Sequence, residues 1–354
     1  MKFAIGIPLL NNASNVKNLI FSIRATTSET PPIFVLDNGS TEPGVADEVA
    51  AFCTMAGVTL IREATNTGVP GAWNRLAVRS DADVVILLND DLRASTRGWL
   101  ESVKSVFELN DNVGIVYWGQ KLVSPATGVV ARYTSDSLHF KSGCTHPLVR
   151  ANFSGAFFAI RRSLWSDVRQ PDGSVGFWDD LLSYGEEFDT SAECHKRNLL
   201  IVQLPFFWEH LHSQTFKASP TLRLRTSGPS AYLDDAEYLE FCHRFPQLGG
   251  IRIKGRKERL AIAVGLARQR PPEYPRLPYS LAMVFKKWCD EKILGIPAHQ
   301  LFEEMMRNGA PRAIQAAAER GDVVRSPLRY RDLDGIERTA SWDELTSDPT
   351  PNLC

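Results

Sequence analysis

The chain has 354 residues, of which 44% are hydrophobic and 23% charged, and its formal net charge at pH 7 is −1. This balance argues against a nucleic-acid binder or an acidic-tail protein on overall charge. The six cysteines form no CxxC pair, and no run approaches the roughly 18 apolar residues of a transmembrane helix. We therefore expect reduced thiols and a cytoplasmic location, or a peripheral one at a membrane surface.

The first hundred residues alternate short apolar runs with amphipathic stretches. Strands are predicted at residues 3–10, 32–37, 58–64 and 83–88. Helices are predicted at residues 13–26, 44–57 and 68–80. Ser14 or Asn15 is the expected N-cap of the first helix, and Gly57 is expected to end the second. This alternation predicts an α/β fold with a parallel sheet covered by helices on both faces.

Polar or turn-forming residues follow all four predicted strands. They are Pro8 with Asn11 and Asn12, then Asp37 to Ser40, then Asn66 to Gly68, and finally Asn89 to Asp91. Each group alone reads as an ordinary turn. Because the carboxyl ends of parallel strands lie at one edge of a sheet, we expect these groups to line a ligand site together.

Phosphate-binding glycine motifs are missing from the sequence. Neither GxGxxG nor GxxxxGK[ST] is present, which argues against a dinucleotide fold and a P-loop enzyme. A phosphate group at this edge would then need a metal ion. The adjacent carboxylates of Asp90 and Asp91 repel each other, so they mark either a solvated strand end or a cation site.

Six segments resemble the nucleotide-sugar-dependent glycosyltransferases of the GT-A fold, most closely family 2. They are residues 7–23, 33–41, 66–74, 84–92, 152–165 and 177–198. The resemblance covers residues 1–215, which we take as the catalytic domain. It implies a Rossmann-like fold whose mostly parallel central sheet is flanked by helices.

The first motifs of that family hold the nucleotide. By resemblance, Pro8, Asn11 and Asp37 would face the base and ribose, with Asn66 and Gly68 nearby.

The acidic motif of the family binds a divalent cation. By resemblance Asp91 is the metal ligand and Asp90 turns toward the sugar or ribose, while Asn89 departs from the usual two-carboxylate pattern. A later histidine, His210 or His212, would supply a second ligand. Oxygen ligands of this kind suit Mn²⁺ or Mg²⁺.

The segment SYGEEFD holds three acids within four residues, which indicates a solvated helix start or a functional pocket. By resemblance Glu187 is the catalytic base, and Glu186 could take that role instead. A neighbouring carboxylate raises the pKa of such a base. A base here implies inversion at the anomeric carbon. No QxxRW-like element follows, so transfer of one sugar per encounter is expected.

Residues near this base are expected to contact the sugars. Gly155, between Ser154 and Ala156, would form a floor under the donor sugar, or simply allow close packing in a buried strand. By resemblance the acceptor or sugar contacts include Trp178, Asp179 and Asp180.

Residues 216–354 are expected to form a mainly helical second region, including a helix over 257–269, with a partly disordered end at 341–354. Residues 217–270 carry eleven Lys and Arg against five Asp and Glu. This excess indicates a solvated face, or contact with a lipid-linked sugar at a membrane or with a nucleic acid.

The sequence therefore predicts a metal-dependent, inverting glycosyltransferase that moves one sugar from a nucleoside-diphosphate sugar to an acceptor hydroxyl. The acceptor would be a glycan, a lipid-linked sugar or a modified nucleic acid. The alternative is a catalytically silent nucleotide-sugar-binding protein on the same fold. A nucleotidyltransferase is disfavoured, because no glycine-rich basic loop follows the first strand.

Overall fold

The computed structural model describes residues 1–124, 127–134, 137–150, 152–153, 155–168, 174–177, 186–211, 251–252, 267–269, 318–321 and 324–347. The side chains of Glu186, Phe188, Asp189 and Ala192 lie outside this description.

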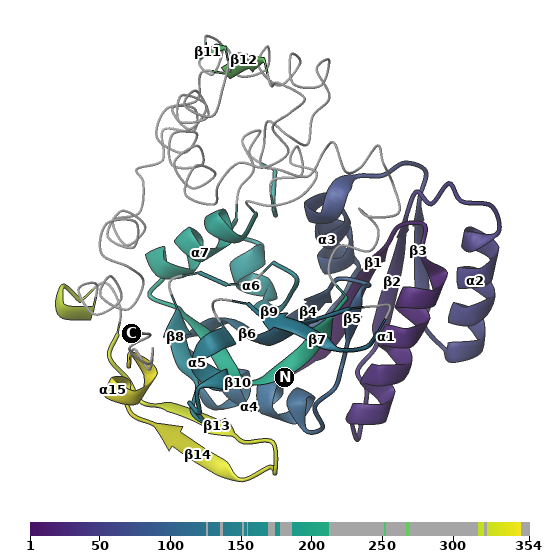
Figure 1. The fold of residues 1–354 in the computed structure, drawn as a ribbon. Helices are drawn as coiled ribbons and strands as arrows, with labels where there is room; N and C mark the ends of the chain where they lie inside the picture. The colour runs from purple at the N-terminus through teal and green to yellow at the C-terminus, as the bar shows by residue number, and fades with distance from the viewer. Residues whose placement is uncertain are drawn as a thin grey trace.

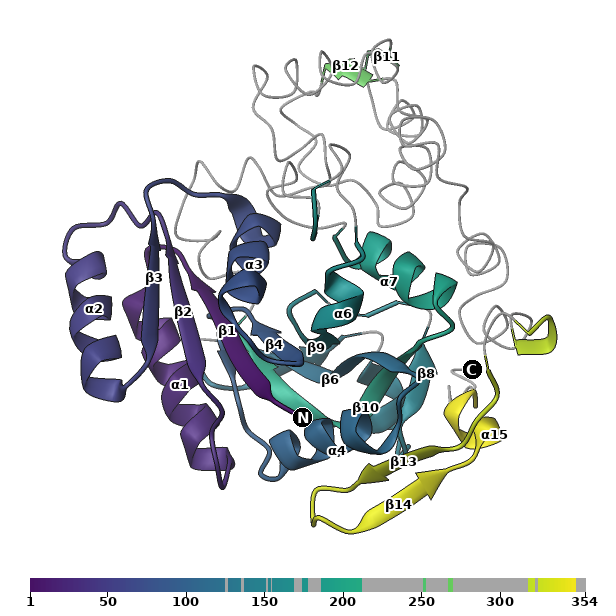
Figure 2. The ribbon, with the colours of Figure 1, turned by 180° about the vertical axis from the view of Figure 1, so that it is seen from behind.

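A mixed sheet of ten strands forms the centre of the molecule (Figures 1 and 2). Its strands are β1 (Phe3–Leu9), β2 (Ile33–Asn38), β3 (Thr59–Glu63), β4 (Val84–Leu88), β5 (Leu92–Arg93), β6 (Val113–Val123), β7 (Val130–Tyr133), β8 (Leu148–Arg150), β9 (Phe157–Arg161) and β10 (Leu200–His210). The order is β3-β2-β1-β4-β9-β6-β10-β5, with β7 beside β6 and β8 beside β10. The first four strands run parallel, as the sequence predicted, and β6 and β10 run the same way.

Helices cover both faces of this sheet. They are α1 (Ala13–Thr26), α2 (Val45–Ala56), α3 (Gly68–Arg79), α4 (Trp99–Leu109), α5 (Leu138–Lys141), α6 (Arg162–Trp165) and α7 (Glu186–Lys196). One hydrophobic cluster joins one face to α1, α2 and α4, and a second joins the other face to α3, α6 and α7. The α/β prediction of a sheet covered on both sides is thus confirmed.

The ends of the first helices follow from single side chains. Helix α1 begins at Ala13, because the Asn12 side chain accepts a hydrogen bond from the Asn15 backbone N–H at 3.2 Å. The predicted N-cap, Ser14 or Asn15, was therefore two or three residues late. Helix α2 ends as predicted at Gly57, which adopts the left-handed conformation (φ 61°) that glycine tolerates best.

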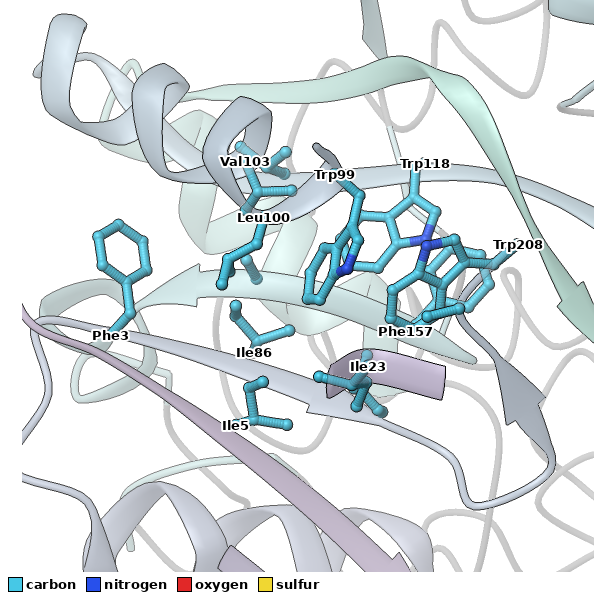
Figure 3. Packing of buried hydrophobic residues seen from close by; sticks show 14 of the residues in the cluster. Phe3, Ile5, Ile23, Ile86, Trp99, Leu100, Val103, Trp118, Phe157 and Trp208 are labelled. Carbon is cyan, nitrogen blue, oxygen red and sulfur yellow. The ribbon is translucent and has the colours of Figure 1, made fainter. Parts of the chain in front are cut away.

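Four large aromatic residues pack under one end of the sheet (Figure 3). The ring centroids of Trp99 and Trp208 lie 4.6 Å apart, those of Trp118 and Phe157 4.9 Å, and those of Trp118 and Trp208 5.1 Å. All four side chains are fully buried. They lock together α4, β6, β9 and β10, so the carboxyl ends of β6 and β10 rest on a rigid base.

Part of the C-terminal third returns to this core. Strands β13 (Leu328–Arg331) and β14 (Glu337–Ala340) form a hairpin beside α4, and helix α15 (Trp342–Leu345) follows beside β8 (Figures 1 and 2). The Asn110 side chain donates to the Arg329 carbonyl at 2.7 Å and accepts from the Arg329 N–H at 3.0 Å, as a neighbouring strand would. Residues 324–347 therefore share the core of the first predicted domain.

Within the end expected to be partly disordered, Ser341 and Glu344 form a capping box and Leu345 is buried, while residues 348–354 lie outside the described part. One expectation for the C-terminal third was wrong where the structure describes it. Strands β11 (Ile251–Arg252) and β12 (Ala267–Gln269) pair in parallel, so no helix covers 267–269. The remaining helices expected in 216–317 lie outside the described residues. No helix in the described part is long and apolar enough to cross a membrane.

Candidate active site

The carboxyl ends of β1, β2 and β4 lie at one edge of the sheet, because these strands are parallel neighbours. The end of β10 reaches the same edge, where Leu211 N–H donates to the Asp91 carbonyl at 2.8 Å. The polar groups that follow the strands are thus brought together as the sequence predicted.

A closed turn holds the residues expected to face the nucleotide. Asp37, only 4% exposed, accepts from the Ser40 N–H at 3.0 Å, and the Ser40 hydroxyl accepts from the Asn11 N–H at 2.9 Å. The Asn11 side-chain oxygen accepts from the Thr41 and Glu42 N–H groups at 2.7 and 3.1 Å. Pro8, near the end of β1, is buried beside Leu36 on β2. Asn11 and Asp37 therefore lie side by side across the β1–β2 edge.

Asn38 organises the neighbouring loop, a role that the sequence analysis did not assign. Its side-chain oxygen accepts from the Thr67 N–H at 3.0 Å and hydroxyl at 2.8 Å. Its amide nitrogen donates to the Asn66 side chain and to the Gly68 carbonyl, both at 3.0 Å. Asn66 and Gly68 thus lie beside the predicted nucleotide residues, held there by Asn38. The only signal in the sequence was its place directly after Asp37.

The acidic motif lies at the end of β4 and is buried. Asp90 is 8% and Asp91 5% exposed. Burial, and then the charge of Asp91, raise the pKa of Asp90 well above its usual range. Oδ2 of Asp90 and Oδ1 of Asn89 are buried without a hydrogen-bond partner. Two buried acceptors without donors are costly, which indicates a place where a ligand supplies donors or positive charge.

His210 approaches the acidic motif from β10. Its Nε2 lies 3.3 Å from Oδ1 of Asp91, and its Nδ1 lies 2.7 Å from Oε1 of Gln120 on β6. Gln120 lies among the apolar residues of β6, and no pattern in the sequence marks it as a site residue. The structure brings together two predicted metal residues, Asp91 and His210, whereas His212 lies outside the described residues.

Glu187, the expected base, lies against Gly155, the residue expected under the donor sugar. A Cβ added at Gly155 would lie 2.8 Å from Oε1 of Glu187, so only glycine lets the carboxylate come this close. The next residue, Ala156, accepts a hydrogen bond at its carbonyl from the Asn89 N–H at 3.0 Å. A continuous line of contacts therefore joins Glu187 to the acidic motif.

Most of the other predicted catalytic and sugar-contacting residues lie outside the described part of the chain. Glu186 begins helix α7, but its side chain lies outside the described part, as do Ser154, Trp178, Asp179 and Asp180. The residue before Trp178 is firmly held. Asn74 of α3 accepts from the Phe177 N–H and donates to the Phe177 carbonyl, both at 2.8 Å. Asn74 therefore fixes the start of the predicted acceptor segment.

The donor set at Asp91 and His210 suits a divalent cation. Mg²⁺ and Mn²⁺ sites commonly use one or two protein ligands and complete their coordination with substrate phosphates and water. Within the described residues, no group of three or more His, Cys, Asp or Glu side chains forms a metal cluster. Asp91 and His210 would therefore supply two ligands to such a cation.

Comparison with solved structures defines the class of fold. A structure of GalNAc-T7 with UDP, GalNAc and Mn²⁺ matches with a TM-score of 0.50 and 14% identity. The match covers 82% of this chain and 56% of that one, so the chain spans little more than half of its length. At this identity the likeness shows the fold alone, which is a GT-A-like α/β fold.

Two further structures are less similar. Mannosyltransferase PcManGT from Pyrobaculum calidifontis, in complex with GDP-Man and Mn²⁺, has a TM-score of 0.46 and 14% identity over 90% of this chain and 75% of that one. S. aureus TarS 1–349 has a TM-score of 0.45 and 15% identity over 96% of each chain.

The sequence itself matches a family. Residues 4–168, a little under half of the chain, match the model of glycosyl transferase family 2. Comparison with curated proteins gave no match.

Proposed function

We propose that the chain is a metal-dependent, inverting glycosyltransferase that moves one sugar from a nucleoside-diphosphate sugar to an acceptor hydroxyl. One observation carries this proposal. The Asp91–His210 pair and the Glu187 carboxylate are linked through neighbouring residues: Glu187 lies beside Gly155, and the next residue, Ala156, accepts a hydrogen bond from Asn89. A cation site next to a buried base is what sugar transfer from a diphosphate requires.

The nucleotide lies, in this proposal, across the ends of β1 and β2. Asn11 and Asp37 form a turn whose backbone groups are already satisfied, so the surface is formed before the donor arrives. Beside this surface lie Pro8, near the end of β1, and the loop that holds Asn66 and Gly68. The buried, partnerless oxygen of Asp90 then faces the sugar or ribose hydroxyls, which supply the missing donors.

Asp91 and His210 would hold Mn²⁺ or Mg²⁺. When bound, the cation supplies Lewis-acid stabilisation for the negative charge that grows on the leaving diphosphate. The chain's own task is to keep the two ligands in place. Strand pairing does this, because His210 lies opposite Leu92, the residue after Asp91.

Glu187 would remove the proton from the acceptor hydroxyl. The acceptor oxygen then forms a bond to the anomeric carbon as the bond from that carbon to the phosphate oxygen breaks, and the electron pair leaves with the nucleoside diphosphate. Attack from the face opposite the leaving group inverts the configuration. Glu187 is only 9% exposed, and its carboxylate lies against Gly155.

Trp178, Asp179 and Asp180 follow the anchored Phe177, and we place the acceptor there. A glycan, a lipid-linked sugar and a modified nucleic acid all fit this proposal, the last two through the basic residues 217–270.

Replacing Glu187 tests the assignment. Glu187→Gln should lower the rate of transfer about 10²- to 10⁴-fold while donor binding stays unchanged, because only the proton acceptor is lost. Transfer and release of nucleoside diphosphate would be measured with Mn²⁺ against a panel of nucleotide sugars, and binding by thermal shift. Glu193→Gln is the matched control, because Glu193 is a partly exposed carboxylate of the same helix that pairs with Lys196 and Arg197.

Two outcomes would change the conclusion. If Glu187→Gln transfers normally and Glu186→Gln does not, the base is Glu186. If the native chain binds a donor with Mn²⁺ but never releases nucleoside diphosphate, it is a silent binding protein on the same fold.

A further inference from the structure

The imidazole of His210 lies between two oxygen acceptors. Its Nδ1 is 2.7 Å from Oε1 of Gln120, and its Nε2 is 3.3 Å from Oδ1 of Asp91. The ring is largely shielded from water, since the His210 side chain is 13% exposed and that of Asp91 7%. The two ring nitrogens therefore interact with fixed protein groups rather than with bulk solvent.

This arrangement determines which nitrogen carries the proton. An amide oxygen can only accept a hydrogen bond, so Nδ1 of His210 must donate to Gln120. In a neutral imidazole Nε2 then carries a lone pair, and this lone pair faces a carboxylate oxygen of Asp91. Two acceptors that face each other at this distance need positive charge between them.

We propose that Gln120 is a positioning residue that fixes the Nδ1–H tautomer of His210 and so presents Nε2, together with Asp91, to the divalent cation. The inference rests on the proposed function, because it assigns a role within the proposed metal site. Groups that bond the second nitrogen of a metal-bound histidine fix its orientation and raise its basicity.

Gln120 is itself held firmly enough for this role. It is 6% exposed, and its backbone N–H donates to the Ser137 hydroxyl at 2.9 Å. Its carbonyl accepts from the Thr134 N–H at 3.3 Å, and the Thr134 and Ser137 hydroxyls lie 2.7 Å apart.

The aromatic cluster supports the same two strands from below. Trp118 precedes Gln120 by two residues and Trp208 precedes His210 by two, so each pair lies on one face of its strand. Because the two indoles pack against each other, Gln120 and His210 cannot easily shift apart.

The opposite orientation of the Gln120 amide would favour the other tautomer of His210. If the amide of Gln120 were turned, its NH₂ group would donate to Nδ1, and Nε2–H would donate to Asp91. Gln120 would then be an ordinary buried polar residue. Glutamate separates the two cases, because a carboxylate accepts a hydrogen bond from Nδ1–H but cannot donate one to Nδ1.

The experiment measures binding of Mn²⁺ alone, from the electron paramagnetic resonance of free Mn²⁺, to four forms of the full chain. These are the native protein, Gln120→Met, Gln120→Glu and the control Gln203→Met. Gln203 is another buried glutamine, on β10, whose side-chain oxygen accepts a hydrogen bond from Arg150. We expect Gln120→Met to weaken binding about 10- to 100-fold. Gln120→Glu should bind at least as tightly as the native protein, and Gln203→Met should bind as the native protein does.

Nitrogen-15 NMR of the histidines in the presence of Mg²⁺ gives a second readout, with the His210 signal assigned by its loss in His210→Ala. The native protein and Gln120→Glu should show a protonated Nδ1, and Gln120→Met should lose this preference. Thermal melting of each variant shows that it is folded.

The outcomes separate the two proposals. Unchanged Mn²⁺ affinity in Gln120→Met, equally weak binding by Gln120→Glu, or a native His210 protonated at Nε2 would overturn the role of Gln120 and leave the metal site standing. A native protein that binds neither Mn²⁺ nor Mg²⁺ would overturn the metal site of the proposed function, and the role of Gln120 with it.

Discussion

The two halves of the sheet edge are built differently. At β1 and β2, the side chains of Asn11, Asp37 and Asn38 are engaged by neighbouring backbone groups. At β4, β6 and β10, side chains approach each other over an aromatic base, and Oδ2 of Asp90 has no partner. The first half is complete by itself, whereas the second half is completed by what it binds. Substitutions in the first should therefore affect stability and donor affinity, and those in the second chiefly chemistry.

The largest effect is expected for Asp91→Asn. It removes an anionic ligand from the proposed cation site, so the rate of transfer should fall by about 10³-fold or more. The melting temperature should stay the same or rise, because a repulsion with Asp90 is relieved. Transfer assays with varied Mn²⁺ and a thermal melt measure both. Loss of folding together with loss of activity would contradict the distinction between the two halves.

Gly155→Ala should have the next largest effect. The added Cβ would lie 2.8 Å from Oε1 of Glu187 and push the carboxylate aside. A displacement of this size costs on the order of 10²-fold in rate.

Combining Gly155→Ala with Glu187→Gln tests whether the fall in rate is caused by displacement of the Glu187 carboxylate. If it does, the two losses are far from additive in a double-mutant cycle. Additive losses would mean that Gly155 acts elsewhere.

Asn38→Ala tests the first half of the edge. The loss of its four hydrogen bonds to residues 66–68 leaves buried groups unpaired, and should lower the free energy of unfolding by about 1–3 kcal/mol. Donor affinity should weaken, while the maximal rate at saturating donor changes little. Denaturant unfolding and donor titration measure these effects. A large fall in maximal rate with normal affinity would show that the two halves act as one.

The smallest effect on activity is expected for Asn110→Ala, which lies away from the edge. It removes both hydrogen bonds to the Arg329 backbone and should cost about 1–3 kcal/mol of stability. Transfer kinetics measured well below the melting temperature should not change. An altered KM or kcat would show that the C-terminal hairpin communicates with the site.

The sequence by itself determined the parallel half of the sheet and the edge at which ligands gather. Apolar strand runs, amphipathic helices and strand-end turns are local patterns, so β1 to β4, α1 to α3 and the strand-end polar residues were predictable. Asp91 was predictable for the same reason, since its signal is an apolar strand that ends in adjacent acids.

Only the tertiary structure decided which distant residues meet. Gln120 lies inside an apolar strand, and its proximity to His210 depends on the pairing of β6 with β10, ninety positions apart. The packing of residues 324–347 against the core depends on side chains such as Asn110, which hydrogen-bonds the Arg329 backbone as a neighbouring strand would. Such contacts leave no periodic trace in the sequence, because they are set by how elements pack and not by how each one forms.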